Sequence, residues 1–211
     1  MEIRWHGHAC FEISNDITIV TDPHDGRSIG IRQPNVMADL VLISHDHWDH
    51  NAARVVRGNP RVIESDFEGT VKGARISSIG TYHDKSKGEK RGTNRVFVID
   101  LDGTKFCHLG DLGHIPSEEK MSRMRGMDVL FIPVGDVFTI GAKEAAEIAR
   151  SLRPKVCVPM HYRIGGLSLS IQPVDDFLGH FPEEQIIRIG NQVSFELDDL
   201  GGKTVIWVFS L

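Results

Sequence analysis

The sequence has no apolar run near the ~20 residues that a membrane-spanning helix needs. Its first residues, "MEIRWHGHACFEI", alternate charged and apolar side chains, whereas a signal peptide has a continuous apolar core. There are only three cysteines, Cys10, Cys107 and Cys157, each within an apolar, strand-like run. An odd number of widely spaced cysteines argues against a disulfide framework and favours burial as small hydrophobes. These absences predict a protein that binds no membrane and resides in the cytoplasm.

The chain also has fewer basic than acidic residues. The 211 residues carry 24 basic and 29 acidic side chains, a formal net charge of −5, so no overall field attracts nucleic acid. The chain contains no linker, low-complexity segment or fixed-period repeat, which at this length predicts a single domain over residues 1–211. It also lacks a Gly-x-Ser-x-Gly motif, which excludes the usual serine nucleophile elbow.

What the chain does contain is mostly β-strand. Alternating or continuously apolar runs predict about a dozen strands, and two helical patterns lie among them at 116–126 and 142–152. The strands are predicted at 2–13, 17–22, 39–44, 74–83, 94–103, 104–111, 128–135, 155–162, 185–190, 193–198 and 204–210. This inventory favours an α/β sandwich of two packed sheets with helices outside them.

The stretch "SHDHWDH", residues 44–50, holds three histidines and two aspartates directly after the predicted strand 39–44. Three more strands end in a residue that can bind metal, namely His83, Asp111 and His161. His45 and His47, two positions apart, can chelate one ion, and Asp49 and His50 can turn toward a second. Imidazole and carboxylate ligands without thiolate suit zinc, manganese or iron. Alternatively, Asp49 or Asn51 caps a helix that begins near residue 51, but capping does not explain three histidines.

The motif resembles the His-x-His-x-Asp-His signature of the metallo-β-lactamase superfamily. Further stretches resemble motifs of the small metal-dependent hydrolases in that superfamily, namely "GHACFEI…TIVTDP", "HLGDLGH" and "PMHY". This branch includes sugar-phosphate lactonases. The resemblance implies an α/β fold, a four-layer αββα sandwich of two mixed β-sheets. It also implies two divalent ions, with Zn²⁺ expected and Mn²⁺ or Fe²⁺ as alternatives. One ion would be held by His45, His47 and His83, the other by Asp49, His50 and His161, with Asp111 bridging them.

The third ligand of the first ion has two candidates, His83 and His108. His108 and Asp111 are three positions apart, so on a continuing strand their side chains would face opposite ways. If Asp111 reaches the metals, His108 does not. This argument favours His83 as the ligand and places His108 behind the site or in the core.

Two ions about 3.5–4 Å apart would lower the pKa of a water to near neutrality and polarise the scissile carbonyl or phosphoryl oxygen. Hydroxide is then the nucleophile, and Asp49 and Asp111 are the catalytic candidates. Asp22 and His8 are candidates for supporting the ligands from behind. His114 and Tyr162 could donate a proton to a leaving group. Three further histidines carry no pattern and are predicted at the surface: His6, His24 and His180.

The segment 83–95 is basic within an acidic chain and contains Gly88 and Gly92. It predicts a mobile lid whose cations attract an anionic substrate, with Lys90 and Arg91 as candidate contacts. Alternatively, it is a solvated loop. The other cations of the segment are Lys85, Lys87 and Arg95.

These features favour a hydrolase that acts on a small ester, lactone or phosphodiester. Flavodiiron oxidoreductases share the implied fold, but in them glutamate typically replaces the second histidine of the signature, here His47, and a flavin domain is usually attached. Nucleases of the superfamily generally add an RNA-gripping arm or a large insertion, which neither this length nor this charge suits. The expected partner is therefore a small-molecule substrate, possibly anionic, and not nucleic acid or membrane.

Overall fold

The computed structural model describes all residues from 1 to 211 and contains fourteen β-strands in two mixed sheets. The first sheet has six strands in the spatial order β13-β1-β2-β3-β4-β5. Its strands are β1 (Glu2–Trp5), β2 (Phe11–Ser14), β3 (Thr18–Thr21), β4 (Leu40–Leu42), β5 (Arg61–Ile63) and β13 (Gln192–Ser194). The pairs β3–β4 and β4–β5 are parallel, and the others are antiparallel.

The second sheet has eight strands in the order β12-β14-β11-β10-β9-β8-β7-β6. They are β6 (Glu68–Val71), β7 (Ala74–Tyr82), β8 (Thr93–Leu101), β9 (Thr104–His108), β10 (Val129–Pro133), β11 (Val156–Met160), β12 (Ile186–Arg188) and β14 (Val205–Val208). Strands β9 to β12 and β14 run parallel, and β6 to β8 add an antiparallel meander. The predicted sandwich of two mixed sheets is confirmed.

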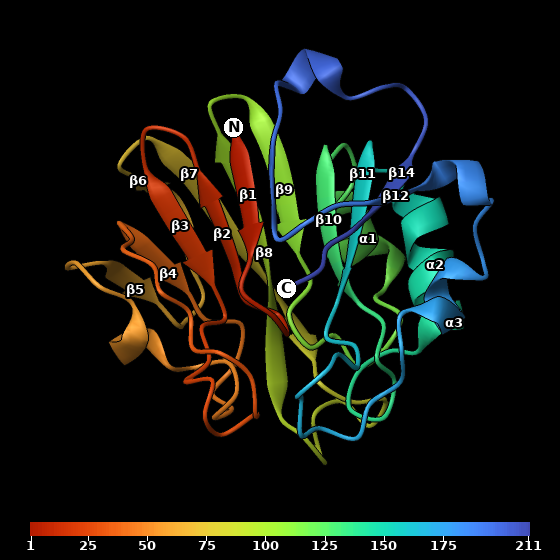
Figure 1. Ribbon diagram of the computed structural model, residues 1–211, viewed down its shortest axis with the longest axis horizontal. Helices are drawn as coiled ribbons and strands as arrows, with labels where there is room; N and C mark the ends of the chain where they lie inside the picture. Colours follow the sequence, from red (N-terminus) through yellow and green to blue (C-terminus); the bar gives the residue numbers. More distant parts are fainter.

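Three α-helices, α1 (Glu118–Arg123), α2 (Ala142–Leu152) and α3 (Asp175–Leu178), lie on the side of the eight-stranded sheet (Figure 1). Helix α2 has the predicted bounds and buries the expected apolar stripe. Helix α1 is shorter than the predicted 116–126, because Ser117 is its N-cap and Met124 its C-cap. Outside the six-stranded sheet the helical layer is reduced to loops and the single-turn 3-10 helix η1 (Ala53–Val55). Two further single-turn helices are η2 (Glu183–Gln185) and η3 (Leu197–Asp199).

The main core is one cluster of 46 buried apolar residues, which fills the space between the two sheets and continues beneath helices α2 and α3. Phe11 of β2 and Phe131 of β10 pack across the interface with ring centroids 4.5 Å apart. Truncating either ring to alanine would cost about 3–5 kcal/mol, as large core deletions do. The outer face of the six-stranded sheet carries a smaller cluster of seven residues, including Val20, Val41 and Cys10. The sheets are thus fixed to each other independently of any ligand.

Three local predictions were wrong. The predicted strand 2–13 is two antiparallel strands, β1 and β2, because the chain turns back through Gly7 (φ 95°) and His8 (φ 55°). Strands β5 and β6 have short, mostly exposed faces and no strong apolar pattern, so they were missed. No helix begins at residue 51 for Asp49 or Asn51 to cap, and η1 has no side-chain cap. The capping alternative for the histidine motif is therefore wrong.

The strand directions bring the polar loops together. Because β7 and β8 are antiparallel, as are β8 and β9, strand β7 runs parallel to β9, β10 and β11. The carboxyl ends of these strands therefore share one edge of the second sheet, and β3 and β4 likewise end together in the first. Asp22, the histidine motif, His83, Asp111 and His161 all follow these ends.

The predicted state of the cysteines is confirmed, since all three are buried and free. None of the helices has the length and apolar character required to cross a bilayer. The cytoplasmic location stays a prediction.

Candidate metal centre

Two groups of side chains meet at the common edge, each with its ligand atoms within 4.8 Å of one another. The three-histidine group consists of His45, His47 and His83. It joins the loop after β4 to the end of β7, and His47 is the one member that is half-buried rather than buried. The group contains the three residues predicted to hold one ion.

The four-residue group consists of His8, Asp49, His50 and His161. Its members come from the turn between β1 and β2, from the histidine motif, and from the residue after β11. His8 and His50 are fully buried, and His161 is 1% exposed. This group contains the three residues predicted for the second ion and adds His8, which the sequence suggested only as a support.

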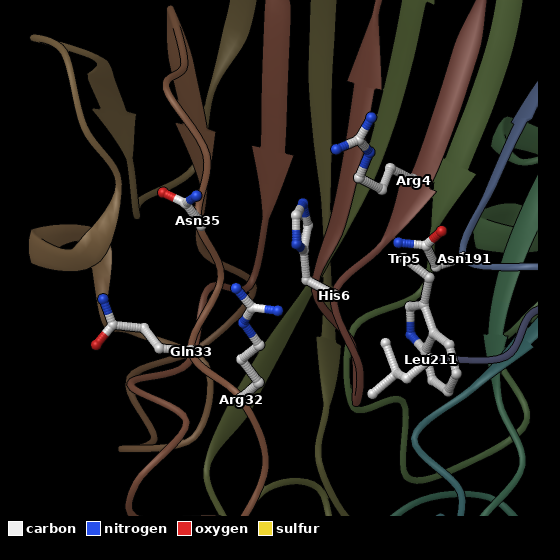
Figure 2. Close-up of a pocket in the computed structure, with 8 residues that line it drawn as sticks. All are labelled: Arg4, Trp5, His6, Arg32, Gln33, Asn35, Asn191 and Leu211. Atoms are coloured by element: carbon white, nitrogen blue, oxygen red, sulfur yellow. The ribbon is translucent and has the colours of Figure 1, made fainter.

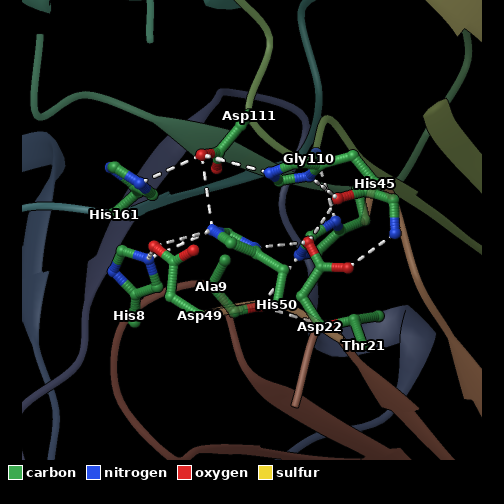
Figure 3. A network of polar contacts seen from close by, with 12 residues as sticks. His8, Ala9, Thr21, Asp22, His45, Asp49, His50, Gly110, Asp111 and His161 are labelled. Atoms are coloured by element: carbon green, nitrogen blue, oxygen red, sulfur yellow. Dashed lines mark hydrogen bonds and ion pairs between the residues drawn. The ribbon is translucent and has the colours of Figure 1, made fainter. Parts of the chain in front are cut away.

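Asp111 lies between the two groups (Figure 3). Its Oδ2 is 3.2 Å from the Nε2 of His83 and 3.8 Å from that of His45, both in the three-histidine group. The same oxygen is 3.1 Å from His161 Nε2 and 3.3 Å from His50 Nε2 in the four-residue group. The carboxylate is thus placed where a bridging ligand would be.

Several polar atoms of the centre are buried without a hydrogen-bond partner, including His45 Nε2 and Asp111 Oδ1. Burying such atoms unpaired is costly, and the cost disappears if a cation binds them. Imidazole nitrogens and carboxylate oxygens are also ligands that zinc accepts readily. The residues present therefore fit divalent metal ions.

Asp22, which lies beside His50 in Figure 3, and Ser44 set the orientation of two imidazoles. Ser44 donates its backbone N–H and its hydroxyl to the Asp22 carboxylate, at 2.7 and 2.6 Å. His50 Nδ1 donates to Asp22 Oδ2 at 3.1 Å, and His45 Nδ1 lies 2.9 Å from the Ser44 hydroxyl. With both Nδ1 atoms protonated, both Nε2 atoms present a lone pair toward the centre. The prediction that Asp22 supports the ligands agrees with this geometry.

The pKa values of the side chains in the centre favour the binding of a cation. Burial would raise the pKa of Asp111, but the neighbouring His161 and His50 hold it well below its usual value, so the carboxylate is ionised. Burial lowers the pKa of His45 to about 3, and the nearby charge of His50 contributes. Burial likewise lowers the pKa of His8 to about 3, with a contribution from His161. The two imidazoles are therefore neutral and can act as ligands.

The loops that carry the ligands are packed against each other at glycines. A Cβ on Gly113 would lie 2.2 Å from the backbone carbonyl carbon of His83, and one on Gly135 would lie 2.0 Å from the His161 carbonyl oxygen. Asn94, fully buried in β8, accepts a hydrogen bond from the Asp111 backbone N–H at 2.9 Å. The same side chain donates to the carbonyl of Leu109 at 2.9 Å, which fixes the start of the loop. The ligands are thus held on rigid supports.

His108 does not contact the centre through a free nitrogen. Its Nε2 donates to the Ala9 carbonyl at 3.0 Å, and its Nδ1 accepts from the Gly110 N–H at 3.2 Å. The preference for His83 over His108 as a ligand agrees with this geometry, and His108 lies behind the site as expected. The reasoning behind it was wrong, however, because β9 ends at His108 and no strand continues to Asp111.

Both candidate proton donors point elsewhere. The Tyr162 hydroxyl donates to the Phe209 carbonyl at 3.0 Å, inside a separate apolar cleft, and burial raises the pKa of the phenol. His114 accepts from the Tyr82 N–H at 3.2 Å, and its other nitrogen donates to the Ile115 carbonyl at 2.9 Å. Neither side chain lines the cavity beside the metal centre, so the geometry removes both as candidates.

The three histidines predicted at the surface differ in placement. His180 is exposed, as predicted. His24 is buried, bonds the His6 carbonyl at 3.0 Å, and has a pKa lowered to about 4 by burial. His6 is half-buried against Glu12, with 2.9 Å between Nε2 and Oε2. The surface prediction was therefore wrong for His24 and incomplete for His6.

A cavity of about 340 Å³ opens onto the centre. Five of its lining residues belong to the two groups or bridge them, namely His47, Asp49, His83, Asp111 and His161. The other walls are Trp48, Arg91, Phe138 and Leu169. The Arg91 guanidinium lies over the Phe138 ring at 4.6 Å, a cation–π contact that holds it at the cavity wall.

The segment 83–95 is anchored, so the structure does not support the predicted mobile lid. The Asp84 carboxylate accepts backbone N–H bonds from Ser86, Gly88, Lys90 and Arg91 at 2.7–3.0 Å. Lys85 also pairs with Glu144 at 2.7 Å, and Arg95 with Asp66 at 3.2 Å. Lys87 and Lys90 are exposed, and neither lines the cavity. Of the five cations in the segment, only Arg91 is in position to meet a substrate.

A second polar pocket, of about 280 Å³, lies beside the end of β1 and is lined by none of the metal-centre residues (Figure 2). Arg4, His6, Arg32 and the chain end at Leu211 line it. His6 lines this pocket, although only Gly7 separates it from His8 in the sequence (Figure 2). The left-handed turn at Gly7 and His8 breaks the alternation that would put residues 6 and 8 on one face, and the two histidines of "HGH" therefore reach different places.

Sequence reasoning missed four residues of the site. Ser44 precedes the motif and could have been found as a neighbour of the ligands, whereas Asn94 and Asp84 act through backbone contacts that leave no spacing signal. Phe138 follows Asp136 and Val137, which both have positive φ near 54° and are not glycine. Aspartate adopts positive φ more often than most residues, but the β-branched valine rarely does, so the residue types do not predict the pair.

The geometry agrees with the comparisons to known proteins. Residues 2–161 match the β-lactamase superfamily domain. A UPF0173 metal-dependent hydrolase of Thermococcus onnurineus is 33% identical over 189 residues, which cover 77% of this chain and 84% of that protein.

A Thermotoga maritima crystal structure, provisionally described as a Zn-dependent hydrolase of the metallo-β-lactamase superfamily, is 41% identical. It superposes with a TM-score of 0.83 and covers 99% of both chains. A Parabacteroides distasonis structure, at 18% identity and a TM-score of 0.69 over 98% of this chain and 91% of that one, shows the fold alone. The chain therefore belongs to the β-lactamase superfamily, among relatives named metal-dependent hydrolases.

Proposed function

We propose that this protein is a hydrolase that uses two divalent metal ions, Zn²⁺ in the first place, to cleave a small ester, lactone or phosphodiester. The three-histidine group would hold one ion. Asp49, His50 and His161 would hold the other, and Asp111 would contact both. One observation carries the proposal: a single buried carboxylate oxygen lies within 3.1–3.8 Å of four imidazole nitrogens, two from each group. Cations shared by the two groups would account for this clustering of ligand atoms around one carboxylate.

The ions, when bound, would supply a water of lowered pKa as the nucleophile and polarise the substrate oxygen. The chain itself supplies the remaining parts. Asp49 lines the cavity and is ionised, because His50 and the contact with His8 hold its pKa below the usual value despite its burial, which acts to raise it. An ionised carboxylate beside the reacting atoms can accept a proton and return it to a leaving group. Asp49 is thus the proposed proton carrier, a role for which Tyr162 and His114 are not in position.

The walls of the cavity favour a small substrate with negative charge. A volume of about 340 Å³ is at the low end for small-molecule sites. Arg91 offers the one side-chain cation on its wall, and its planar guanidinium can bind a phosphate or carboxylate through two hydrogen bonds. Phe138 and Leu169 provide apolar surface beside it. An anionic phosphodiester or lactone suits this combination.

The proposal is tested by assaying chelated protein, and the same protein reloaded with Zn²⁺ or Mn²⁺, against phosphodiester, lactone, thioester and β-lactam panels. We expect hydrolysis of at least one phosphodiester or lactone, dependent on reloading. A matched sample of Asp111→Asn should bind fewer ions and show no reloading effect, because the amide removes the bridging charge. Hydrolysis that is unchanged by chelation and by Asp111→Asn would contradict the proposal.

A further inference from the structure

We propose that His8 is itself a metal ligand, so that the ion of the four-residue group has a complete set of protein ligands. The other ion, held by the three-histidine group, would then keep the open position for substrate. This inference rests on the proposed function and deepens it, because it assigns different roles to the two ions.

The distances around His8 are those expected for ligands of one ion. Its Nε2 lies 3.1 Å from His50 Nε2 and 3.2 Å from Asp49 Oδ2. Its ring is also stacked at an angle on that of His161, with centroids 4.1 Å apart. Zinc bonds of about 2.0–2.1 Å in a tetrahedral arrangement separate neighbouring ligand atoms by about 3.3 Å. His8 therefore meets His50 and Asp49 at ligand-to-ligand separation.

With an ion bound, His8 cannot act as a mere hydrogen-bond donor. His50 donates its Nδ1 proton to Asp22, so in the neutral form that a metal ligand requires, its Nε2 faces His8 with a lone pair. A proton on His8 Nε2 would point into the space between the ligand atoms and would be repelled by an ion there. Without that proton, two lone pairs face each other at 3.1 Å, which is favourable only if a cation lies between them.

The backbone presents the His8 imidazole in a fixed position. Residue 8 is in the left-handed region, with φ 55°, which costs energy for a residue other than glycine. Two hydrogen bonds to its carbonyl hold it there, from Trp5 Nε1 at 3.1 Å and from the His161 N–H at 3.2 Å. The turn is closed by a bond from the Cys10 N–H to the Gly7 carbonyl at 3.0 Å. Such strain is retained where the surrounding structure determines it, commonly at functional sites.

The cavity is lined by members of both groups. His47 and His83 line it from the three-histidine group, and Asp49 and His161 line it from the four-residue group, whereas His8 and His50 are fully buried behind it. Together with Asp111, the four-residue group offers five protein side chains to one ion, and the three-histidine group offers four to the other. Zinc takes four ligands and can expand to five, so five protein side chains leave no position free, whereas an ion with four can still accept a substrate oxygen as a fifth ligand. The substrate would therefore meet the ion held by His45, His47 and His83.

The test counts coordinated histidines directly, without an activity assay. Protein with ¹⁵N-labelled histidine rings is loaded with Co²⁺ to saturation, and NMR resolves ring nitrogens that the paramagnetic ion shifts far outside the normal range. We expect six coordinated imidazoles: His8, His45, His47, His50, His83 and His161. Five, with the His8 signals in the normal range, would overturn the inference while leaving the proposed two-ion hydrolase intact. Failure to bind cobalt at all would overturn both.

Two variants separate ligation from hydrogen bonding. His8→Gln keeps a side chain able to donate to Asp49 but removes the imidazole, and we expect it to lose one coordinated-histidine signal and to bind the second Co²⁺ at least about 10-fold more weakly. His6→Gln, in the same turn but directed into the other pocket, should keep all six signals. If His8→Gln fails to fold, the count in the unmodified protein still decides the question.

Discussion

The two groups of metal-binding residues differ in where their members come from and in what covers them. The three-histidine group is drawn from the motif and the end of β7, and its half-buried member, His47, faces the cavity. The four-residue group joins the β1–β2 turn of the first sheet to the end of β11 in the second, and it includes the fully buried His8 and His50. Both groups join the two sheets and both contribute to the cavity wall, so they differ in burial and in the number of protein ligands. The difference indicates a division of work: the ion with fewer protein ligands meets the substrate, and the more deeply buried ion stabilises the fold.

Removing Asp111, the carboxylate that contacts both groups, should have the largest effect on activity and metal content. Asp111→Ala takes away the one carboxylate that contacts both, so we expect activity to fall to background, a loss of at least about 10³-fold, and at least one ion to be lost. Activity assays with elemental analysis of the same sample would show it. Full metal content in this variant would mean that Asp111 bridges nothing.

The next largest difference between the two groups should be in how much their bound ions stabilise the protein. Saturation at about 1,000 times Kd stabilises a protein by about 4 kcal/mol, on the order of 10 °C in Tm at this size. We expect His161→Ala to lose most of the stabilisation that Zn²⁺ gives, since it removes a ligand of the more deeply buried ion. His47→Ala should abolish activity but keep most of the rise in Tm. Equal losses in calorimetry would remove the proposed division of work.

A smaller contrast concerns His83 and His108. We expect His83→Ala to abolish activity and weaken one ion, because its Nε2 lies 3.2 Å from Asp111 Oδ2. His108→Ala should reduce activity only about 10–100-fold, as changes behind a metal site do. Kinetics and metal titration of the two purified variants would compare them. The reverse ranking would show that the wrong histidine has been assigned.

The smallest effect is expected at the cavity wall. Arg91→Ala should raise KM for an anionic substrate about 10-fold and weaken its dependence on salt, because the guanidinium lines the cavity. Lys90→Ala is a matched control, since Lys90 is exposed and lines no part of the cavity. Metal content should not change in either variant. Identical KM values for Arg91→Ala and the unmodified protein at low salt would show that the segment 83–95 is only a solvated loop.

The sequence predicted the elements and the strand-end ligands well because both leave local signals. Apolar periodicity marked most strands and helix α2, and the motif spacing identified the loop after β4. Directions of individual side chains were less predictable. Tyr162 follows His161 in sequence, but the chain bends at His161 (φ 54°) just after β11 ends, and the Tyr162 hydroxyl bonds the Phe209 carbonyl instead.

The role of His8 was hidden for a related reason. The strand predicted over 2–13 turns at Gly7, and an isolated glycine between two histidines was the only sign of that turn. Because the turn redirects His8 and His6 to different pockets, their sequence proximity was uninformative. Contacts through the backbone, such as those of Asn94 and Asp84, left no pattern at all.

The central claim is that this fold holds two divalent ions around Asp111. The most direct measurement is elemental analysis of protein that has been chelated, reloaded with Zn²⁺ and dialysed against metal-free buffer. The account predicts two equivalents of zinc per chain. Retention of no stoichiometric metal after this treatment would contradict it.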